Sequence, residues 1–210
     1  MKLIGMLDSP YVRRTAIGLK LQGISFEHLP LSVFSTFDEF RELNPVVKAP
    51  TLIMDDGQVL MDSTLILDYA QHCLGASRSL LPTSTRERVT ALRHIGLALA
   101  ACEKTVQIVY ERNLRPIEKQ HEPLMDRFRT QLLGAYNALE TAWLQTAASG
   151  DESHMGLSEV SVAVAWRFTQ LMLPEIVRCE DFPRAETVFS MGRRATCLYI
   201  NPHCLRGRDD

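Results

Sequence analysis

The amino-acid sequence predicts two unequal domains, a small α/β domain followed by an all-helical domain. Up to Leu74 the chain alternates between short apolar runs, typical of strands, and segments with apolar residues at helical spacing. Residues 75–88 then contain glycine, proline and a cluster of Ser, Thr and Arg, a composition typical of a connection, and beyond them only the helical spacing continues. We therefore expect an α/β domain over 1–78, a linker over 79–88 and a helical domain over 89–210.

The composition is that of an ordinary globular protein and excludes several functional classes. The 210 residues include 23 Lys and Arg against 25 Asp and Glu, a net charge of -2, and 46% are hydrophobic. Binding to nucleic acid or to an anionic membrane surface needs a basic excess, so we expect neither partner. The longest apolar run, Ile95–Cys102, is far shorter than the ~18 residues of a membrane-spanning helix, and Leu3–Leu7 is too short for a secretory signal.

The cysteines and histidines favour a cytoplasmic protein without a metal site. The 5 cysteines are an odd number and include no Cys-x-x-Cys pair, which favours free thiols in a reducing compartment over a disulfide framework. The 6 histidines are scattered, with no HxH or HExxH spacing, so we expect no metal. The sequence also has no phosphate-binding P-loop, no GxGxxG and no GxSxG motif.

The first predicted strand and helix meet at Ser9. The strand is the apolar run Lys2–Met6, and the proline after Ser9 suits a first helical turn because its missing N–H would have no partner there. Apolar residues continue at helical spacing to Leu19, and Gly23 fits the position just past a helix end. The alternation in Ile24–Leu31 predicts a second strand.

The rest of the first domain is predicted as a short helix, a hairpin and a third helix. The helix covers Thr36–Leu43, and the hairpin strands are Thr51–Met54 and Val59–Met61, joined by the turn signal Asp55–Gly57. Asp62–Ser63 can cap the helix that follows. The resulting order β-α-β-α-β-β-α is that of a thioredoxin-like domain.

The second half of the chain is predicted to be entirely helical. Apolar residues recur every three or four positions, and proline or glycine interrupts the pattern at three breaks. The predicted helices cover roughly residues 86–112, 123–147, 158–173 and 184–199.

Three motifs in this order resemble the cytosolic glutathione S-transferase family, particularly bacterial members of the serine type. They are Ser9–Arg13 (SPYVR) after the first strand, Asn44–Pro50 (NPVVKAP) before the third, and Asp62–Ser63 at the start of the third helix. The resemblance covers nearly the whole chain. It implies the fold of that family, a thioredoxin-like domain followed by a helical bundle.

Ser9 is the candidate catalytic residue. A serine before a proline at a helix start is explained equally by plain helix capping. The resemblance implies a further role, in which the Ser9 hydroxyl donates a hydrogen bond to the thiol of glutathione and favours its thiolate. Dithiol–disulfide exchange is excluded, because Ser9 and Val12 stand where such enzymes carry cysteines and the first cysteine is Cys73.

The resemblance implies three further contacts with glutathione. Ala49 and Pro50 match a loop with a cis proline, whose backbone pairs with the cysteinyl part. Lys48 can bind the glycine carboxylate, although a solvated lysine is an equal alternative. Asp62 and Ser63 would bind the γ-glutamyl end at a helix N-terminus, although simple capping explains the pair as well. In the helical half, Gly156–Ser161 resembles the capping motif of the family, with Ser158 as the expected cap and Ser161 in place of an aspartate.

These residues predict a glutathione transferase, with glutathione as co-substrate, that conjugates the thiolate to a small hydrophobic electrophile entering from the helical domain. The end of its first long helix, with Tyr110 and Arg112, is where the family places the acceptor pocket, although solvated charges also explain it. The resemblance further implies a homodimer and a role in detoxification. Two alternatives stay open: a non-catalytic binding or adaptor protein with this fold, and another glutathione-dependent reaction such as isomerisation, dehalogenation or peroxide reduction.

Overall fold

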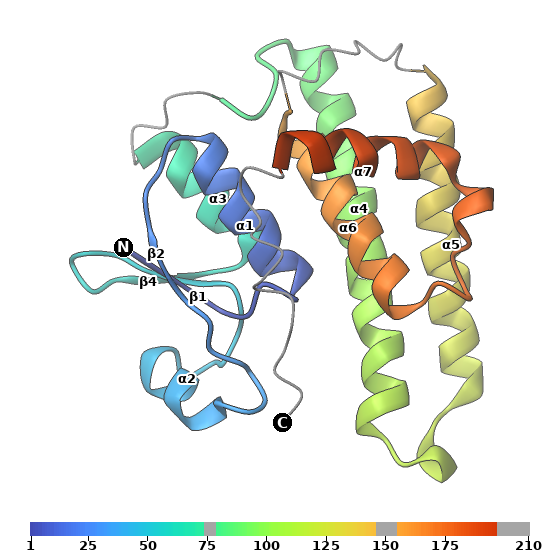
Figure 1. Cartoon of the computed structure of the whole chain (residues 1–210), viewed down its shortest axis with the longest axis horizontal. Coiled ribbons are helices and arrows are strands. Elements are labelled where there is room, and N and C mark those ends of the chain that lie inside the picture. The colour runs from blue at the N-terminus through green and yellow to red at the C-terminus, as the bar shows by residue number, and fades with distance from the viewer. Residues whose placement is uncertain (74–78, 146–154, 197–210) are drawn as a thin grey trace. The chain divides into compact units, whose positions relative to one another are not determined.

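The computed structural model describes residues 1–73, 79–145 and 155–196, which belong to two compact units. The first unit holds Met1–Leu80 and the second holds Leu81–Ala195 (Figure 1). The two units meet at Leu80 and Leu81, and the first long helix of the second unit begins at Thr85.

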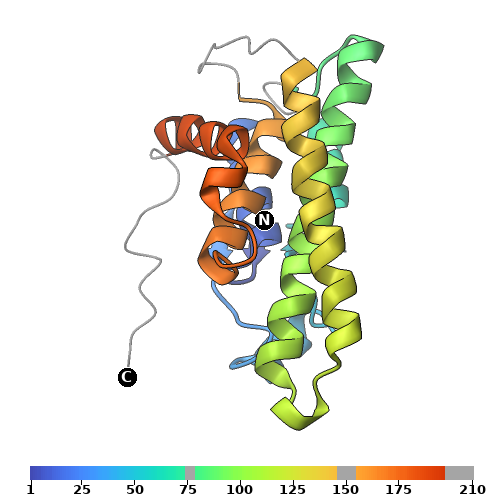
Figure 2. The ribbon, with the colours of Figure 1, turned by 90° about the vertical axis from the view of Figure 1, so that its right-hand side faces the viewer.

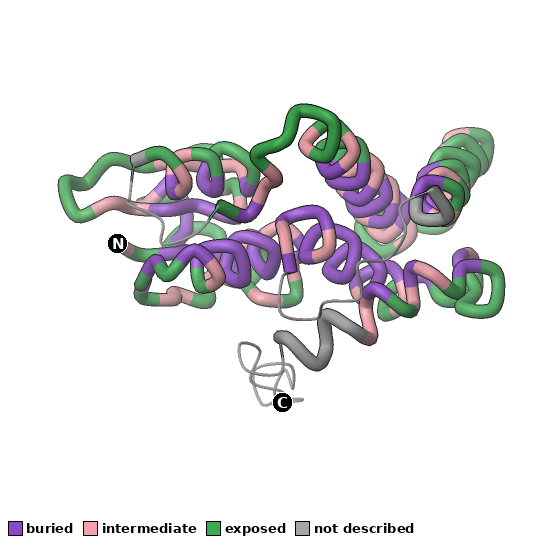
Figure 3. Tube along the Cα trace, turned by 90° about the horizontal axis from the view of Figure 1, so that it is seen from above, coloured by how far each residue is buried: buried purple, intermediate pink, exposed green. Residues whose placement is uncertain are grey.

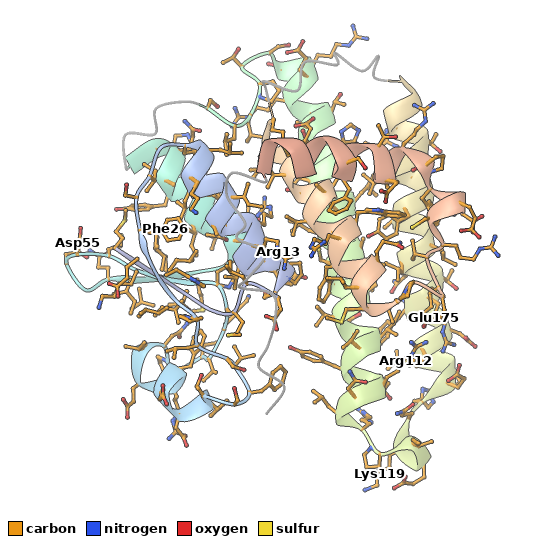
Figure 4. All side chains as sticks on the ribbon, in the orientation of Figure 1. Arg13, Phe26, Asp55, Arg112, Lys119 and Glu175 are labelled. Atoms are coloured by element: carbon orange, nitrogen blue, oxygen red, sulfur yellow. The ribbon has the colours of Figure 1, made fainter. Side chains whose placement is uncertain are left out.

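The first unit has the element order that the sequence predicts, with slightly shorter strands. Its elements are β1 (Lys2–Ile4), α1 (Pro10–Leu21), β2 (Glu27–Leu29), α2 (Phe37–Leu43), β3 (Thr51–Ile53), β4 (Val59–Met61) and α3 (Ser63–Cys73). The strands form one sheet in the order β2-β1-β3-β4, in which β1 pairs parallel with β2 and antiparallel with β3. Strands β3 and β4 are antiparallel, and Asp55 lies at the tip of their hairpin (Figure 4). This topology is thioredoxin-like.

Helices α1 and α3 run parallel and in contact (Figure 1). Three pairs of residues face each other at intervals of four positions along both helices. These pairs are Arg14–Ser63, Gly18–Leu67 and Gln22–Gln71. A Cβ on Gly18 would lie 2.5 Å from Cδ2 of Leu67, so a larger residue there would displace the Leu67 side chain or push the helices apart. Because both helices run in the same direction, their N-termini lie at the same end of the pair.

The regular secondary structure of the second unit, in its described residues, consists of helices. Its elements are α4 (Thr85–Leu114), α5 (Glu122–Gln145), α6 (Leu157–Met172) and α7 (Pro183–Thr196), with short 3₁₀ turns at Ile117–Lys119 and Cys179–Asp181. Helices α4 and α5 pack along each other, and α6 packs on α4 (Figure 2). Every residue of α6 from Val160 to Trp166 is buried, so α6 is the core helix of this unit (Figure 3). None of the described helices is long and apolar enough to cross a membrane.

The core of the second unit contains a small hydrogen-bonded network. The hydroxyl of Tyr136 donates to Oγ1 of Thr169 at 2.8 Å, and Thr105 Oγ1 lies 2.9 Å from the same atom. The ring of Trp166 packs edge-on against Tyr136 at 5.4 Å between centroids, and its Nε1 donates to Glu186 Oε2 at 2.6 Å. Burial raises the pKa of Tyr136, so its hydroxyl remains protonated. These polar groups therefore satisfy one another within the core.

The start of α6 differs from the sequence-based expectation. Ser158 was expected to cap the helix, but α6 begins at Leu157 and the cap position is Gly156. Glu159, the third residue of the helix, accepts hydrogen bonds from the backbone N–H of Gly156 at 3.0 Å and from the Ser158 hydroxyl at 2.9 Å. The acidic residue of the cap, Glu159, therefore lies two positions before Ser161, where the family motif has its aspartate. Ser161 lies inside the helix, and its hydroxyl donates to the carbonyl of Leu157.

Candidate functional site

The turn from β1 into α1 places Ser9 at a helix N-terminus. Ser9 has extended backbone angles (φ -62°, ψ 126°) and is the N-cap of α1, where its Oγ accepts a long hydrogen bond of 3.4 Å from the N–H of Val12. As an acceptor in this contact, the half-buried hydroxyl keeps its own hydrogen for donation. The capping interpretation is thus correct in geometry, and it is compatible with donation to a ligand.

Gly5 brings this turn against the proline loop. It has φ +132°, a conformation that L side chains rarely adopt. A Cβ at this position would lie 2.6 Å from Cγ2 of Val12 and 2.9 Å from Cβ of Ala49. Gly5 therefore permits β1, the start of α1 and the loop before β3 to approach closely.

A network centred on Asn44 shapes the loop before β3. The buried side chain of Asn44 donates to Thr51 Oγ1 at 2.8 Å and accepts from the N–H of Val46 at 3.0 Å. Thr51 in turn donates to the carbonyl of Lys48 at 2.7 Å. These bonds hold Val47 at φ 50°, which is an uncommon conformation for a β-branched residue.

The peptide bond between Ala49 and Pro50 is cis, as the family resemblance implies. Pro50 is buried and Ala49 is half-buried, next to the Cβ position of Gly5. The loop thus reaches β3 with Ala49 beside the turn that carries Ser9.

Asp62 caps helix α3. Its Oδ1 accepts from the N–H of Thr64 at 2.8 Å, and its carbonyl accepts the first helical bond from Ile66. Asp62 adopts φ 80°, so the cap is held in a left-handed conformation, which costs of order 1–3 kcal/mol for a residue other than glycine. Ser63 is the first helical residue, and its buried Oγ accepts from Nη1 of Arg14 at 2.9 Å.

Lys48 and Asp62 connect the proline loop with the start of α3. The Nζ of Lys48 lies 3.9 Å from Oδ2 of Asp62, and both side chains are about half exposed. Lys48 was expected to bind a ligand carboxylate or water, and in this structure it faces Asp62. Solvent screens such a pair, so its contribution to stability is small.

The structure brings all six sequence-predicted residues into one region of the first unit. Ser9 lies at the start of α1, and Asp62–Ser63 lie at the start of α3, the neighbouring parallel helix. Arg14 is level with Ser63, so α1 begins about four residues, or about 6 Å, ahead of α3. Ala49–Pro50 contacts the first helix start through Gly5, and Lys48 approaches the second. Two helix N-termini give this region a positive potential that favours anions.

Sequence reasoning missed two buried residues that bond to this region: Arg14, which bonds to Ser63, and Asn44, which bonds within the loop before β3. Both side chains are 2% exposed, and Asn44 was noted as the first residue of the NPVVKAP motif, with no contact assigned to its side chain. A signal for Arg14 was present, because the residues four and eight positions later are Gly18 and Gln22, which continue a polar or small stripe on α1. The partner of that stripe could not be read from the sequence.

The second unit holds the residues considered for an acceptor pocket. Tyr110 is exposed, and Arg112 donates to Glu175 at 2.6 Å (Figure 4). Burial opposes ionisation of Glu175, but the hydrogen bond and charge of Arg112 outweigh it and lower the pKa of the carboxyl. Arg112 is thus engaged in an ion pair. Among the described residues, no group of three or more His, Cys, Asp or Glu could hold a metal ion.

Comparisons with known proteins agree with this architecture. Residues 3–75 match the family described as glutathione S-transferase, N-terminal domain. The structure of a glutathione transferase family member from Pseudomonas fluorescens Pf-5 with bound glutathione has a TM-score of 0.79 and 29% identity, covering 96% of this chain and 98% of that one. An uncharacterized GST-like protein of Escherichia coli, YibF, is 25% identical over 79% of this chain and 81% of its own length. The chain spans about half, 53%, of glutathione S-transferase U4 of Arabidopsis thaliana, at 29% identity.

A thioredoxin-like unit with a cis-proline loop, followed by a helical unit, defines the class of two-domain thioredoxin-like proteins. Within that class, residues 3–75 match the N-terminal domain of the glutathione S-transferase family, and nearly the whole chain is similar in structure to a member of that family.

Proposed function

We propose that this protein is a glutathione transferase that binds glutathione along the first unit and joins its sulfur to a small hydrophobic electrophile. The single observation that carries this proposal is the arrangement of the two parallel helices. Their N-termini present Ser9 and Ser63 at one end, and the cis-proline loop lies beside the first of them. The relative from Pseudomonas fluorescens Pf-5, which has this fold, was obtained with bound glutathione.

In this proposal the tripeptide lies with its cysteine at the start of α1 and its γ-glutamyl carboxylate at the start of α3. The backbone of Ala49, next to Pro50, pairs with the cysteinyl residue. Asp62 and Ser63 receive the γ-glutamyl end, and Lys48 receives the glycine carboxylate.

The chemistry required of the protein is modest. Ser9 donates its hydrogen to the sulfur, and the start of α1 adds the positive end of a helix dipole. Lowering the thiol pKa by about two units needs roughly 2.7 kcal/mol of differential stabilisation. The thiolate then attacks the electrophilic carbon, forming a carbon–sulfur bond while the electron pair moves to the leaving group or to the adjacent acceptor atom. Binding both reactants together supplies the remainder of the acceleration.

The finer points of this function are also proposals. The helical unit would supply the pocket for the electrophile, and the protein would act as a cytoplasmic homodimer in detoxification. A binding or adaptor protein with the same fold would need no thiol activation, so the ionisation of the bound thiol distinguishes the two functions.

The test combines calorimetric titration with glutathione and the ultraviolet absorbance of the bound thiolate as a function of pH. The variants are Ser9→Ala and the matched control Ser9→Thr, which keeps both the hydroxyl and the cap. We expect saturable binding in all three proteins, and a thiol pKa that is depressed in the wild type and in Ser9→Thr but not in Ser9→Ala. A wild type that does not bind millimolar glutathione would overturn the proposal. Binding with an undepressed thiol pKa in the wild type would favour the adaptor.

A further inference from the structure

Arg14 makes a buried polar contact next to the candidate site. Arg14 lies on α1 one turn after the N-terminal turn and is 2% exposed. Its Nη1 donates to Ser63 Oγ at 2.9 Å and to Thr64 Oγ1 at 3.2 Å, both in the first turn of α3. A guanidinium is always charged, so this contact keeps a positive charge buried directly behind the N-terminus of α3.

The packing of α1 on α3 fixes this contact. Gly18, four residues after Arg14, allows the helices to approach until a Cβ would be 2.5 Å from Leu67. Gln22, four residues further on, bonds through Nε2 to Oε1 of Gln71 at 3.3 Å. Arg14 is thus the first member of a stripe along α1, and it is the member that reaches the start of α3.

The direction of the hydrogen bond determines what Ser63 can do. A guanidinium has no acceptor, so Arg14 donates and Ser63 Oγ accepts. The hydroxyl hydrogen of Ser63 is then directed away from Arg14 and serves as a donor. A donor at a helix N-terminus with a buried cation behind it suits an anion, whereas a hydroxyl that pointed its hydrogen into the unit would not.

We infer that Arg14 is a positioning residue for the carboxylate end of the ligand: it orients Ser63 as a donor and adds buried positive charge behind the start of α3. This inference rests on the proposed function. Arg14 is buried and acts through Ser63, so it affects the α-carboxylate of the γ-glutamyl residue and leaves the thiol end, at Ser9, unaffected.

The experiment compares two ligands that differ only in that carboxylate. These are glutathione and 4-aminobutyryl-cysteinyl-glycine, which lacks the α-carboxylate. For the wild type we expect glutathione to bind about tenfold more tightly or better, the range of a charge-assisted hydrogen bond. Arg14→Met should lose most of this preference. Its affinity for the analogue should stay within about twofold, a change that is smaller than the loss of one charge-assisted hydrogen bond would cause. The pKa of the bound thiol should not change.

Two controls separate positioning from stability. Gln22→Met disturbs the α1–α3 contact at its far end and should lower the melting temperature without changing the preference between ligands. Where Arg14→Met folds poorly, Arg14→Lys keeps the charge but not the fork, and it is compared in wild-type and Ser63→Ala backgrounds. We expect Arg14→Lys to weaken glutathione binding in the first background and to have no further effect in the second.

The outcomes distinguish the two proposals. Equal losses for both ligands in Arg14→Met, or an effect of Arg14→Lys that persists without the Ser63 hydroxyl, would overturn the role of Arg14 and leave the proposed function standing. A wild type that binds neither ligand would overturn the proposed function and this inference with it.

Discussion

The two units bury polar side chains in different places. In the first unit, Arg14 and Asn44 are buried but bond to the ends of elements, at the start of α3 and in the proline loop. In the second, Tyr136, Thr105 and Thr169 bond to one another between helices. The first arrangement orders groups of the candidate site, whereas the second completes a core. This difference shows that burial of a polar side chain does not by itself indicate function. The location of its hydrogen-bond partner does.

The largest expected effect is in the core of the second unit. Trp166→Ala removes a fully buried ring that packs on Tyr136 and Phe182, so we expect a loss of about 3–5 kcal/mol in the free energy of unfolding. Chemical denaturation would measure this loss. If glutathione binds along the first unit as we propose, the glutathione affinity of the folded variant stays unchanged, and a large fall in affinity contradicts that placement.

In the first unit, Gly5→Ala should affect both stability and binding. The new Cβ would meet Val12 at 2.6 Å and Ala49 at 2.9 Å in a backbone of φ +132°. We expect a loss of about 1–3 kcal/mol of stability, together with weaker glutathione binding because the proline loop moves away from Ser9. Gly134→Ala in α5 is the matched control, since a Cβ there meets nothing within 4 Å. Unchanged binding in Gly5→Ala would show that the loop position does not matter to the ligand.

A pH-dependent effect of intermediate size is expected in the second unit. Burial lowers the pKa of His94, Glu159 opposes this shift and Arg93 adds to it. A histidine whose pKa is lower in the folded state stabilises the protein fully above its unfolded value of about 6.5 and loses that contribution as the pH falls. Denaturant unfolding at pH 7.5 and at acid pH should show this loss in the wild type, with a smaller loss in His94→Gln. An equal loss in the free energy of unfolding between the two pH values in both proteins would exclude His94 as the cause.

The smallest expected effect is a gain. Val47→Gly removes a β-branched residue from φ 50°, which relieves about 1–2 kcal/mol of strain, while the flexibility of glycine in the unfolded chain takes back about 0.5–1 kcal/mol. We expect a net stabilisation of about 0.5 kcal/mol, measured as a small rise in the denaturation midpoint. A lower denaturation midpoint would contradict this prediction, because it would mean that losing the Val47 side chain costs more stability than the relief of backbone strain returns.

Much of the fold could be predicted because its signals are local. The turn at Asp55–Gly57, the proline after Ser9 and the alternation of apolar residues each depend on neighbours in the chain, and the structure has the predicted order of elements. The start of α6 was predicted wrongly because Gly156 has no side chain with which to signal a cap. Its cap is instead supported by Glu159, which accepts from the N–H of Gly156. The spacing of residues in the sequence did not decide between Gly156 and Ser158 as the cap.

The residues of the candidate site could be named from the sequence, but the contacts among them could not be predicted. Ser9 and Asp62 are recognisable because serine and aspartate before a helix have a local physical meaning. The bond from Arg14 to Ser63 joins residues 49 positions apart and depends on the register of two helices, which Gly18 sets by its lack of a side chain. Likewise, the approach of Lys48 to Asp62 follows from the folding of the loop.

The parallel course of α1 and α3 predicts that an anionic ligand bound at the candidate site stabilises the first unit. Two helices side by side in the same direction place like poles next to each other, and this repulsion raises the free energy of the folded unit. An anion held at the two helix starts neutralises the repulsion. The free energy of unfolding of the first unit is therefore expected to rise with the concentration of a carboxylate ligand that binds there.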